Sequence, residues 1–227
     1  MTSQASAEIK AFNKVEIYGP SFSNFVRSIM VLCEEYQIDY CTGLNFAGEM
    51  VELKSEQHFK LHPYGKFPIV KHQTFILCET ASICRYIQTT FMPKSSLNFT
   101  THQMARIDAF SAIISIYLDK ALIRDYLLEF VFPKGDQGNV RLDVVESRQQ
   151  AAREALVIIE NELQQSDTLN NEQLSIADVL LAPILHYLSG LPAPFNLIHD
   201  SLTVRNYLNS LMARESVNKI LIAPKNW

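Results

Sequence analysis

The chain has 227 residues, 48% of them hydrophobic and 19% charged, which is enough to bury one substantial core or two smaller ones. Its formal net charge of −4, without a run of lysine and arginine, argues against a nucleic-acid-binding protein. No apolar run approaches the roughly 20 residues that a membrane span needs, and the polar start at residues 1–14 lacks the apolar core of a secretory signal, so we expect a cytoplasmic protein.

The first elements predicted along the chain are a strand and an amphipathic helix. Lys14 to Tyr18 alternate between polar and apolar side chains, as in a strand, and a Gly-Pro-Ser break follows. From Val26 to Cys33 the apolar residues recur with the period of a helix, which places Cys33 on the buried stripe as a structural cysteine. Ser23 stands at the mouth of this helix, where a serine is most often an N-cap.

The next predicted elements are a second strand, a short helix and, after a proline turn, a hairpin. They occupy residues 39–46, 55–61, 69–70 and 74–78, with the hairpin turn at residues 71–73. The proline turn reads Pro-x-Gly-x-x-Pro from Pro63 to Pro68, which places Pro68 at the start or edge of a strand, and the turn is a candidate place for a cis X–Pro bond. This order predicts a mixed sheet with a terminal hairpin.

Glu79 and Thr80 open the helix that follows the hairpin, because helical spacing begins there with Ile83 and Ile87. The free N–H groups of a helix N-terminus bind a carboxylate, and a neighbouring glutamate binds an ammonium. This corner therefore suits the head group of an α-amino acid. A helix cap is the more common role of such a pair, and the residues alone leave both roles open.

The second half of the chain is predicted to be all-α and to form a domain of its own. Residues 91–101 contain proline, serine, threonine and asparagine without a helical period, which indicates a linker between domains at residues 1–90 and 102–227. Loops are expected at residues 132–138 and 166–173. Ser175 and Asp178 have the spacing of a capping box, and the apolar helix behind them is expected to be the buried centre of this half.

The cysteines and histidines give no sign of a metal site. The four cysteines form no Cys-x-x-Cys pair, and reduced thiols fit a cytoplasmic protein. Three histidines stand near one another in the sequence but in different predicted elements and without the spacing of zinc ligands. They are His58, His62 and His72. We therefore expect no metal.

The proline turn, the hairpin and the Glu79-Thr80 pair together resemble the glutathione-binding half of the glutathione transferases, through Gly65-Lys66-Phe67-Pro68-Ile69-Val70 and the acid-hydroxyl pair. The family usually has Glu-Ser or Asp-Ser there, and Thr80 keeps the hydroxyl. Ser23 to Arg27 is similar to the Ser-x-x-x-Arg of serine-type members, theta-like and phi-like ones included. Ser175 to Asp178 resembles the capping motif of the family's helical domain, so the resemblance spans both halves.

This resemblance implies a thioredoxin-like α/β domain followed by an all-α domain, and it implies that Ser23 is catalytic. Ser21 in the same turn and Tyr18 at the end of the first strand are the alternatives. The residues that would bind glutathione are Lys54, Lys66, Phe67, Pro68, Glu79 and Thr80. His58 aligns loosely with a basic position of the family, and we expect it on a solvated helix face.

The expected function is conjugation of glutathione, as co-substrate, to electrophilic and largely apolar small molecules, as in detoxification. The resemblance implies a homodimer and places the electrophile near Phe110, Ile114 and Tyr117, although the helical period of these residues favours a core position for each of them. Two alternatives remain open. One is a glutathione-dependent isomerase, dehalogenase or peroxidase on the same fold. The other is a non-catalytic interaction protein, since a fold does not fix a function.

Overall fold

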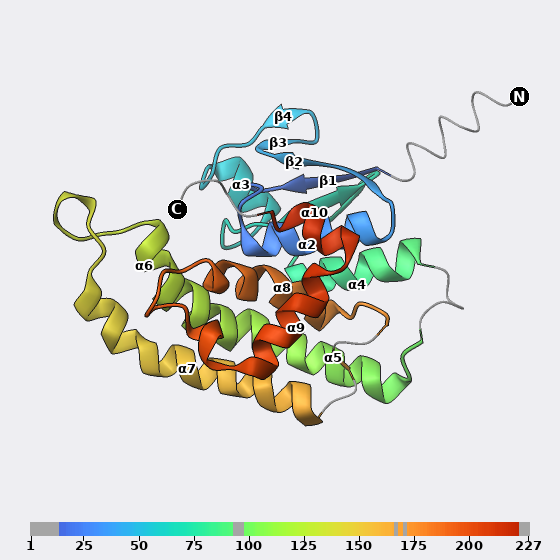
Figure 1. Ribbon diagram of the computed structural model, residues 1–227. Coiled ribbons are helices and arrows are strands. Elements are labelled where there is room, and N and C mark those ends of the chain that lie inside the picture. Colours follow the sequence, from blue (N-terminus) through green and yellow to red (C-terminus); the bar gives the residue numbers. More distant parts are fainter. Residues whose placement is uncertain (1–13, 93–97, 166–167, 170–171, 223–227) are drawn as a thin grey trace, which may run out of the picture. The chain divides into compact units, whose positions relative to one another are not determined.

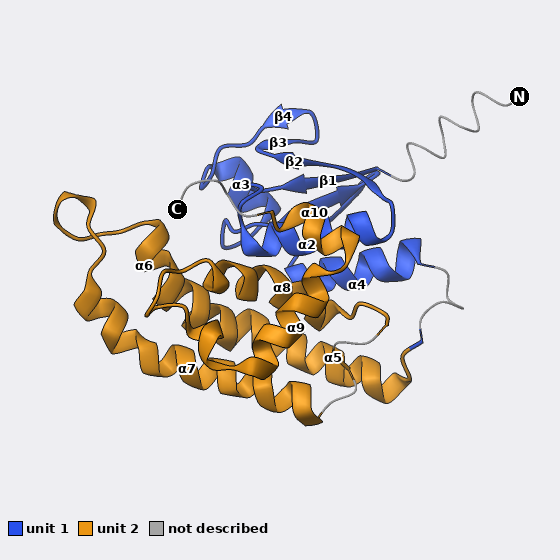
Figure 2. Cartoon of the chain, viewed as in Figure 1, with its two compact units in different colours: residues 1–98 blue, residues 99–227 orange. Residues whose placement is uncertain are grey.

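The computed structural model of the protein describes residues 14–92, 98–165, 168–169 and 172–222. The chain forms two compact units, residues 1–98 and residues 99–227, which Figure 2 shows in different colours. The predicted linker at residues 91–101 and the predicted loop at residues 166–173 both lie partly outside the described residues.

The first unit is a mixed sheet with helices packed on it (Figure 1). Its elements are β1 (Lys14–Tyr18), α2 (Asn24–Glu35), β2 (Asp39–Gly43), β3 (Asn45–Phe46), β4 (Glu49–Met50), α3 (Glu56–Leu61), β5 (Ile69–His72), β6 (Phe75–Cys78) and α4 (Thr80–Phe91). The strand order is β2-β1-β5-β6. Strand β1 is parallel to β2 and antiparallel to β5, and β6 is antiparallel to β5. The predicted mixed sheet with a terminal hairpin is confirmed.

Two local predictions in this unit were wrong. Lys71 and His72 belong to strand β5 and not to the turn, because they continue the ladder with β1 and Lys71 Nζ lies 3.0 Å from Glu16 Oε1. The predicted strand at residues 39–46 ends at Gly43, whose φ of +143° breaks the extended backbone. Strands β3 and β4 then form a separate short hairpin.

Helices α2 and α4 pack against each other in the first unit and bury two cysteines. Cys33 and Cys84 are both fully buried. Burial raises the pKa of the Cys84 thiol to about 12 and raises the pKa of Cys33 as well. Because only the thiolate is a strong nucleophile, these thiols are inert, and the structural role predicted for Cys33 is confirmed.

The second unit consists of helices (Figure 1). They are α5 (Thr101–Ile113), η2 (Ile114–Leu127), α6 (Leu128–Val131), η3 (Asp136–Gly138), α7 (Leu142–Gln165), α8 (Ile176–Ser189), η4 (Leu197–Asp200), α9 (Leu202–Met212) and α10 (Glu215–Ile220). Helix α5 continues into η2, which is π-helical, and η2 into α6, since the residues at both junctions keep helical backbone angles. The expected loop follows at Phe132. No helix among the described residues is long and apolar enough to cross a membrane.

Helix α8 is the buried centre of the second unit, as predicted, and a capping box starts it. The Asp178 N–H donates to Ser175 Oγ at 3.1 Å, and the Ser175 N–H donates to Asp178 Oδ2 at 2.8 Å. The Tyr207 hydroxyl on α9 donates to Asp178 Oδ1 at 2.6 Å. The carboxylate therefore joins the start of α8 to α9 as well as capping the helix, and the sequence did not indicate this second contact.

Replacing Asp178 with alanine is expected to destabilise the protein by about 1–3 kcal/mol, because a buried N–H group and a buried hydroxyl lose their acceptor away from water. Thermal and urea unfolding measure this loss. Tyr207→Phe is the matched control, since it removes the bond between helices and leaves the capping box, and its loss should be smaller. An Asp178→Ala variant as stable as the wild type would contradict a structural role for this carboxylate.

Candidate active site

The register of the sheet brings three separate segments of the first unit to one place. Tyr18 at the end of β1 is paired with Ile69 at the start of β5, and Ile69 is paired with Cys78 at the end of β6. The segments that follow β1, precede β5 and follow β6 therefore meet at the same end of the sheet. They hold Ser23, the Phe67–Pro68 pair and the Glu79–Thr80 pair.

Gly19 lets the first two of these segments pack closely. Its φ is +139°, which L side chains rarely adopt. A Cβ atom at this position would lie 2.8 Å from Val26 Cγ2 and 3.0 Å from the Cβ of Phe67. The turn that leads to Ser23 therefore lies directly against Phe67, and only glycine fits there.

Ser23 is the N-cap residue of α2, but its hydroxyl does not cap the helix. Its backbone is extended, with φ −68° and ψ 132°, and its side chain makes no capping hydrogen bond. The Ser23 carbonyl accepts from the Arg27 N–H at 2.9 Å, and the Arg27 Nε–H donates to the Ser21 carbonyl at 3.2 Å, which ties the turn to the helix. Within the described part of the chain, the Ser23 hydroxyl has no hydrogen-bond partner. It is thus available to a ligand at a helix N-terminus.

The two alternatives to Ser23 differ in their surroundings. Tyr18 is fully buried, its hydroxyl donates to the Val51 carbonyl at 3.0 Å, and burial raises its pKa. The packing role predicted for Tyr18 is confirmed. Ser21 is exposed in the same turn as Ser23, so the structure leaves it available.

The Phe67–Pro68 bond is cis, as the proline turn indicated. Pro68 is buried, and Phe67 stands just before β5. Among the residues that the structure describes, neither the N–H nor the carbonyl of Phe67 has a hydrogen-bond partner. A donor and an acceptor on one residue can pair with an extended peptide, as a neighbouring strand would.

Glu79 is the N-cap residue of α4, and it too makes no capping hydrogen bond. Its φ of +72° is uncommon for a residue other than glycine, and such strain is often stored at functional sites. Its side chain is 72% exposed, so the carboxylate can meet a ligand. Thr80 is buried as the first residue of α4, and its hydroxyl has no partner among the residues described. The sequence left a capping role open for Glu79 and Thr80, but neither side chain caps α4 in the structure.

His62 faces Glu79, and sequence reasoning missed this contact because it considered the histidine only as a metal ligand. The ring is 3% exposed, and its Nε2 lies 3.5 Å from Glu79 Oε1. The Tyr64 N–H donates to Nδ1 at 3.1 Å, so the hydrogen of the neutral ring is on Nε2, the nitrogen that lies near the carboxylate. Burial lowers the pKa of His62, against the opposing effect of Glu79. The imidazole thus lies beside the carboxylate in its neutral form and leaves the negative charge of Glu79 in place.

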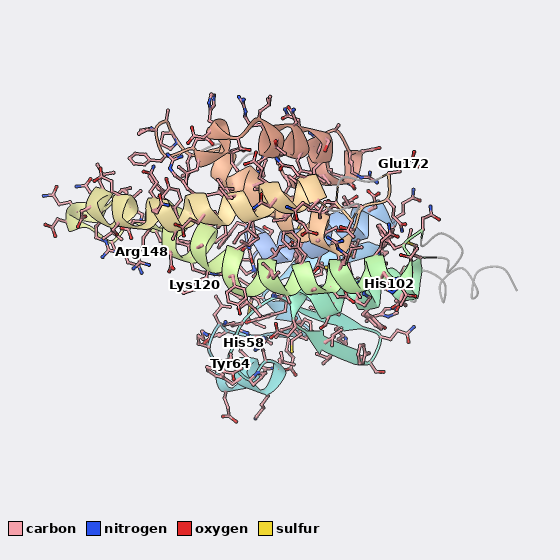
Figure 3. All side chains as sticks on the ribbon, turned by 90° about the horizontal axis from the view of Figure 1, so that it is seen from below. His58, Tyr64, His102, Lys120, Arg148 and Glu172 are labelled. Carbon is pink, nitrogen blue, oxygen red and sulfur yellow. The ribbon has the colours of Figure 1, made fainter. Side chains whose placement is uncertain are left out.

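His58 is fully buried, and its predicted place on a solvated helix face was wrong. The Lys54 N–H donates to Nδ1 at 3.1 Å, and Nε2 donates to the Lys66 carbonyl at 2.9 Å. Its ring also packs edge-on against Tyr18, with the centroids 4.8 Å apart. Figure 3 shows the histidine at α3, close to Tyr64. His58 therefore joins two segments that carry predicted ligand residues.

Lys54 and Lys66 are both exposed beside the proline turn. Lys54 has φ +64°, and its Nζ donates to the Tyr64 carbonyl at 3.1 Å. A Cβ on Gly65 would lie 3.2 Å from Lys54 Cδ and 2.9 Å from the ring of Phe59, so the stem of Lys54 packs over this glycine. The Lys54 ammonium therefore lies at the proline turn. The part of the chain that the structure describes holds no cluster of three or more His, Cys, Asp or Glu that could bind a metal ion.

Comparison with known families accounts for both units. The profile described as "Glutathione S-transferase, N-terminal domain" matches residues 22–90, and the one described as "Glutathione S-transferase, C-terminal domain" matches residues 120–215. The chain belongs to the glutathione S-transferase family. The fold is accordingly the thioredoxin-like domain and helical domain of a glutathione S-transferase, and the protein is an enzyme of that class.

Several similar proteins come from plants. A probable glutathione S-transferase GSTF1 of Oryza sativa is 25% identical, over 93% of this chain and 98% of its own length. Glutathione S-transferase F6 of Arabidopsis thaliana is 23% identical, over 91% of this chain and 99% of its own length. A maize glutathione S-transferase I solved with an atrazine glutathione conjugate superimposes with a TM-score of 0.74 at 23% identity, over 91% and 96% of the two chains. A theta class glutathione S-transferase from Xanthomonas axonopodis with glutathione bound superimposes with a TM-score of 0.76 at 17% identity. The match covers 93% of this chain and 99% of that one.

The residues predicted to contact the electrophile all lie in the helical unit of this glutathione S-transferase, but in different surroundings. Phe110 on α5 is 4% exposed, and Ile114 at the start of η2 is fully buried. Tyr117, one turn further along η2, is 64% exposed. The first two side chains therefore belong to the core of the unit, and only Tyr117 offers its ring to a ligand. Their role in substrate binding stays a prediction.

Proposed function

We propose that this glutathione S-transferase conjugates the glutathione thiolate to electrophilic, largely apolar small molecules, with Ser23 as the residue that stabilises the thiolate. The observation that carries the proposal is the hydroxyl of Ser23. It stands at the start of a twelve-residue helix without a capping bond, at the same end of the sheet as Phe67, whose backbone groups have no partner among the described residues. A serine needed only for stability would be expected to cap the helix.

The chemistry requires a thiolate, because the thiol itself is a weak nucleophile. Lowering a thiol pKa of about 8.5 by about two units needs roughly 2.7 kcal/mol of selective stabilisation of the anion. A hydrogen bond to a charged group contributes about 1.5–3 kcal/mol, and a helix N-terminus adds about 0.3–1 kcal/mol. The Ser23 hydroxyl and the first turn of α2 together meet this requirement.

The rest of the glutathione peptide has a complementary partner for each of its groups. Its α-ammonium would pair with the Glu79 carboxylate, which lies beside His62, and its α-carboxylate with Thr80 and the N–H groups of the first turn of α4. The cysteinyl backbone would pair with the N–H and carbonyl of Phe67, held by the cis bond to Pro68. The glycine carboxylate would lie near Lys54 and Lys66.

The finer parts of this proposal rest on the family. The electrophile is proposed to bind at the helical unit near Tyr117, whose ring is exposed, with Phe110 and Ile114 behind it. A homodimer and a cytoplasmic location are likewise proposed from the sequence and the family. Two other functions compete with this proposal. One is a glutathione-dependent isomerase, dehalogenase or peroxidase activity, and the other is a non-catalytic interaction role.

Retention on immobilised glutathione, followed by turnover of a panel of electrophiles, tests the proposal. We expect the protein to be retained and to convert an aryl halide such as 1-chloro-2,4-dinitrobenzene to its glutathione conjugate, measured by absorbance. Oxidised glutathione formed from an organic hydroperoxide, without any conjugate, would instead identify a peroxidase. Retention without turnover of any substrate would favour a binding protein, and a failure to bind glutathione would refute the proposed site.

A further inference from the structure

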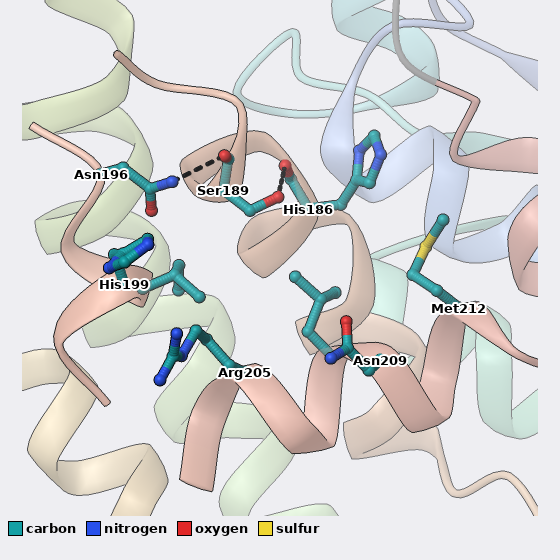
Figure 4. A pocket seen from close by; sticks show the side chains of 9 residues that line it. His186, Ser189, Asn196, His199, Arg205, Asn209 and Met212 are labelled. Atoms are coloured by element: carbon teal, nitrogen blue, oxygen red, sulfur yellow. Dashed lines mark hydrogen bonds between the residues drawn. The ribbon is translucent and has the colours of Figure 1, made fainter. Parts of the chain in front are cut away.

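A second candidate site lies entirely within the helical unit, between α8, η4 and α9 (Figure 4). It is a cavity of about 270 Å³. This volume is slightly below the roughly 300–1,000 Å³ of sites for drug-sized ligands, so it suits a small metabolite. None of the residues that line it takes part in the glutathione site proposed above.

The side chain of Asn196 places a buried acceptor oxygen at the cavity that receives no hydrogen bond from a described residue. Its Nδ2 donates to the Ser189 carbonyl at 2.8 Å, which fixes the orientation of the amide. Its Oδ1 is buried and accepts no hydrogen bond in the described structure. Figure 4 shows this oxygen pointing to the side of the cavity where His199 and Arg205 lie. A buried acceptor left unpaired is costly, so a bound molecule that donates to it would be stabilised.

Arg205 supplies the opposite group, a positive charge without a counter-ion. Its Nε is buried, and its guanidinium makes no hydrogen bond or ion pair with any described residue. The neighbouring carboxylate of Asp200 is already paired with Arg153. A partly buried guanidinium in this state is costly, and a carboxylate in the cavity would relieve that cost by a charge-assisted bond.

The two unpaired groups restrict the chemistry of the ligand. A ligand with acceptors only, such as sulfate, would satisfy Arg205 but would leave Asn196 Oδ1 facing another acceptor. An ammonium would satisfy Oδ1, but it would add a second positive charge near the guanidinium, and none of the described residues that line the cavity carries a carboxylate to balance it. A hydroxyl is a donor that adds no charge. Leu208 and Met212 contribute an apolar wall.

We propose that this cavity binds a small 2-hydroxy carboxylic acid with a short apolar side chain. The carboxylate pairs with Arg205, the hydroxyl donates to Asn196 Oδ1, and the apolar chain packs on Leu208 and Met212. The proposal does not depend on the glutathione site, since all the groups that carry it belong to the helical unit.

Calorimetric titration of the full chain with 2-hydroxy-4-methylpentanoate tests the proposal, in the presence of saturating glutathione. We expect binding to weaken at least tenfold for 4-methylpentanoate, which lacks the hydroxyl, and for 4-methylpentane-1,2-diol, which lacks the carboxylate. Arg205→Met should also weaken binding at least tenfold. Because it removes an unpaired buried donor, the variant should keep or raise the melting temperature of the free protein.

Arg148→Gln is the matched control, because it removes the same charge from the surface of α7 (Figure 3) and should leave affinity unchanged. Met212→Trp, which fills the cavity, is a second variant that should abolish binding if Arg205→Met does not fold. The proposal is overturned if the hydroxy acid does not bind, if glutathione displaces it, or if the folded pocket variants bind it like the wild type. In those cases water satisfies Asn196 and Arg205.

Discussion

Replacing Ser23 with alanine is expected to leave glutathione binding largely intact and to raise the pKa of the bound thiol. The peptide keeps its contacts with Phe67 and Glu79, but the thiolate loses a hydrogen bond that contributes about 1.5–3 kcal/mol, which corresponds to about one to two pKa units. Near neutral pH the thiolate fraction falls, so turnover should drop tenfold or more. Thiolate absorbance of the complex against pH, together with the rate at each pH, measures both effects.

The pH profile separates loss of the thiolate from general damage. Since the variant fails by protonation of the thiol, its rate should recover as pH rises through the new pKa, whereas a misfolded variant would stay slow. Ser21→Ala is the matched control from the same turn and should behave like the wild type. If Ser21→Ala raises the thiol pKa and Ser23→Ala does not, the thiolate is bound by Ser21. If the bound thiol has the wild-type pKa in both variants, neither serine stabilises the thiolate.

Glu79→Ala is expected to weaken glutathione binding by about 1.5–3 kcal/mol, or roughly 10- to 150-fold, because the α-ammonium loses a charge-assisted hydrogen bond. The carboxylate is mostly exposed before binding, so the loss should stay below that of a fully buried ion pair. Calorimetric titration at constant ionic strength measures the change.

Two controls make the Glu79 result specific. A glutathione analogue without the α-amino group should bind the wild type as weakly as glutathione binds the variant, and should bind both proteins equally. Glu56→Ala removes an exposed carboxylate from α3 in the same unit and should leave affinity unchanged. If glutathione and the analogue lost equal affinity in Glu79→Ala, the carboxylate would act on the fold and not on the ammonium.

The sequence predicted most of the elements because their causes are local. The capping box of Ser175 and Asp178 involves residues three apart, and the proline turn around Gly65 depends on its own backbone conformations. The boundaries predicted for the hairpin and for β2 were wrong, because pairing with β1 extends one strand to His72 and the backbone at Gly43 ends another. The role of Ser23 came from a resemblance, since spacing alone favoured a cap.

By itself, the sequence predicted most of the strands and helices in their order, the all-α second half and the candidate residues of the glutathione site. Only the tertiary structure decided which polar groups are already satisfied. It pairs the hydroxyl of Tyr18, buries the ring of His58 and brings His62 close to Glu79, while the hydroxyl of Ser23 has no hydrogen-bond partner among the described residues. Hydrogen-bond partners distant in the sequence meet only when the chain packs, so the free groups that a ligand can use are a property of the fold.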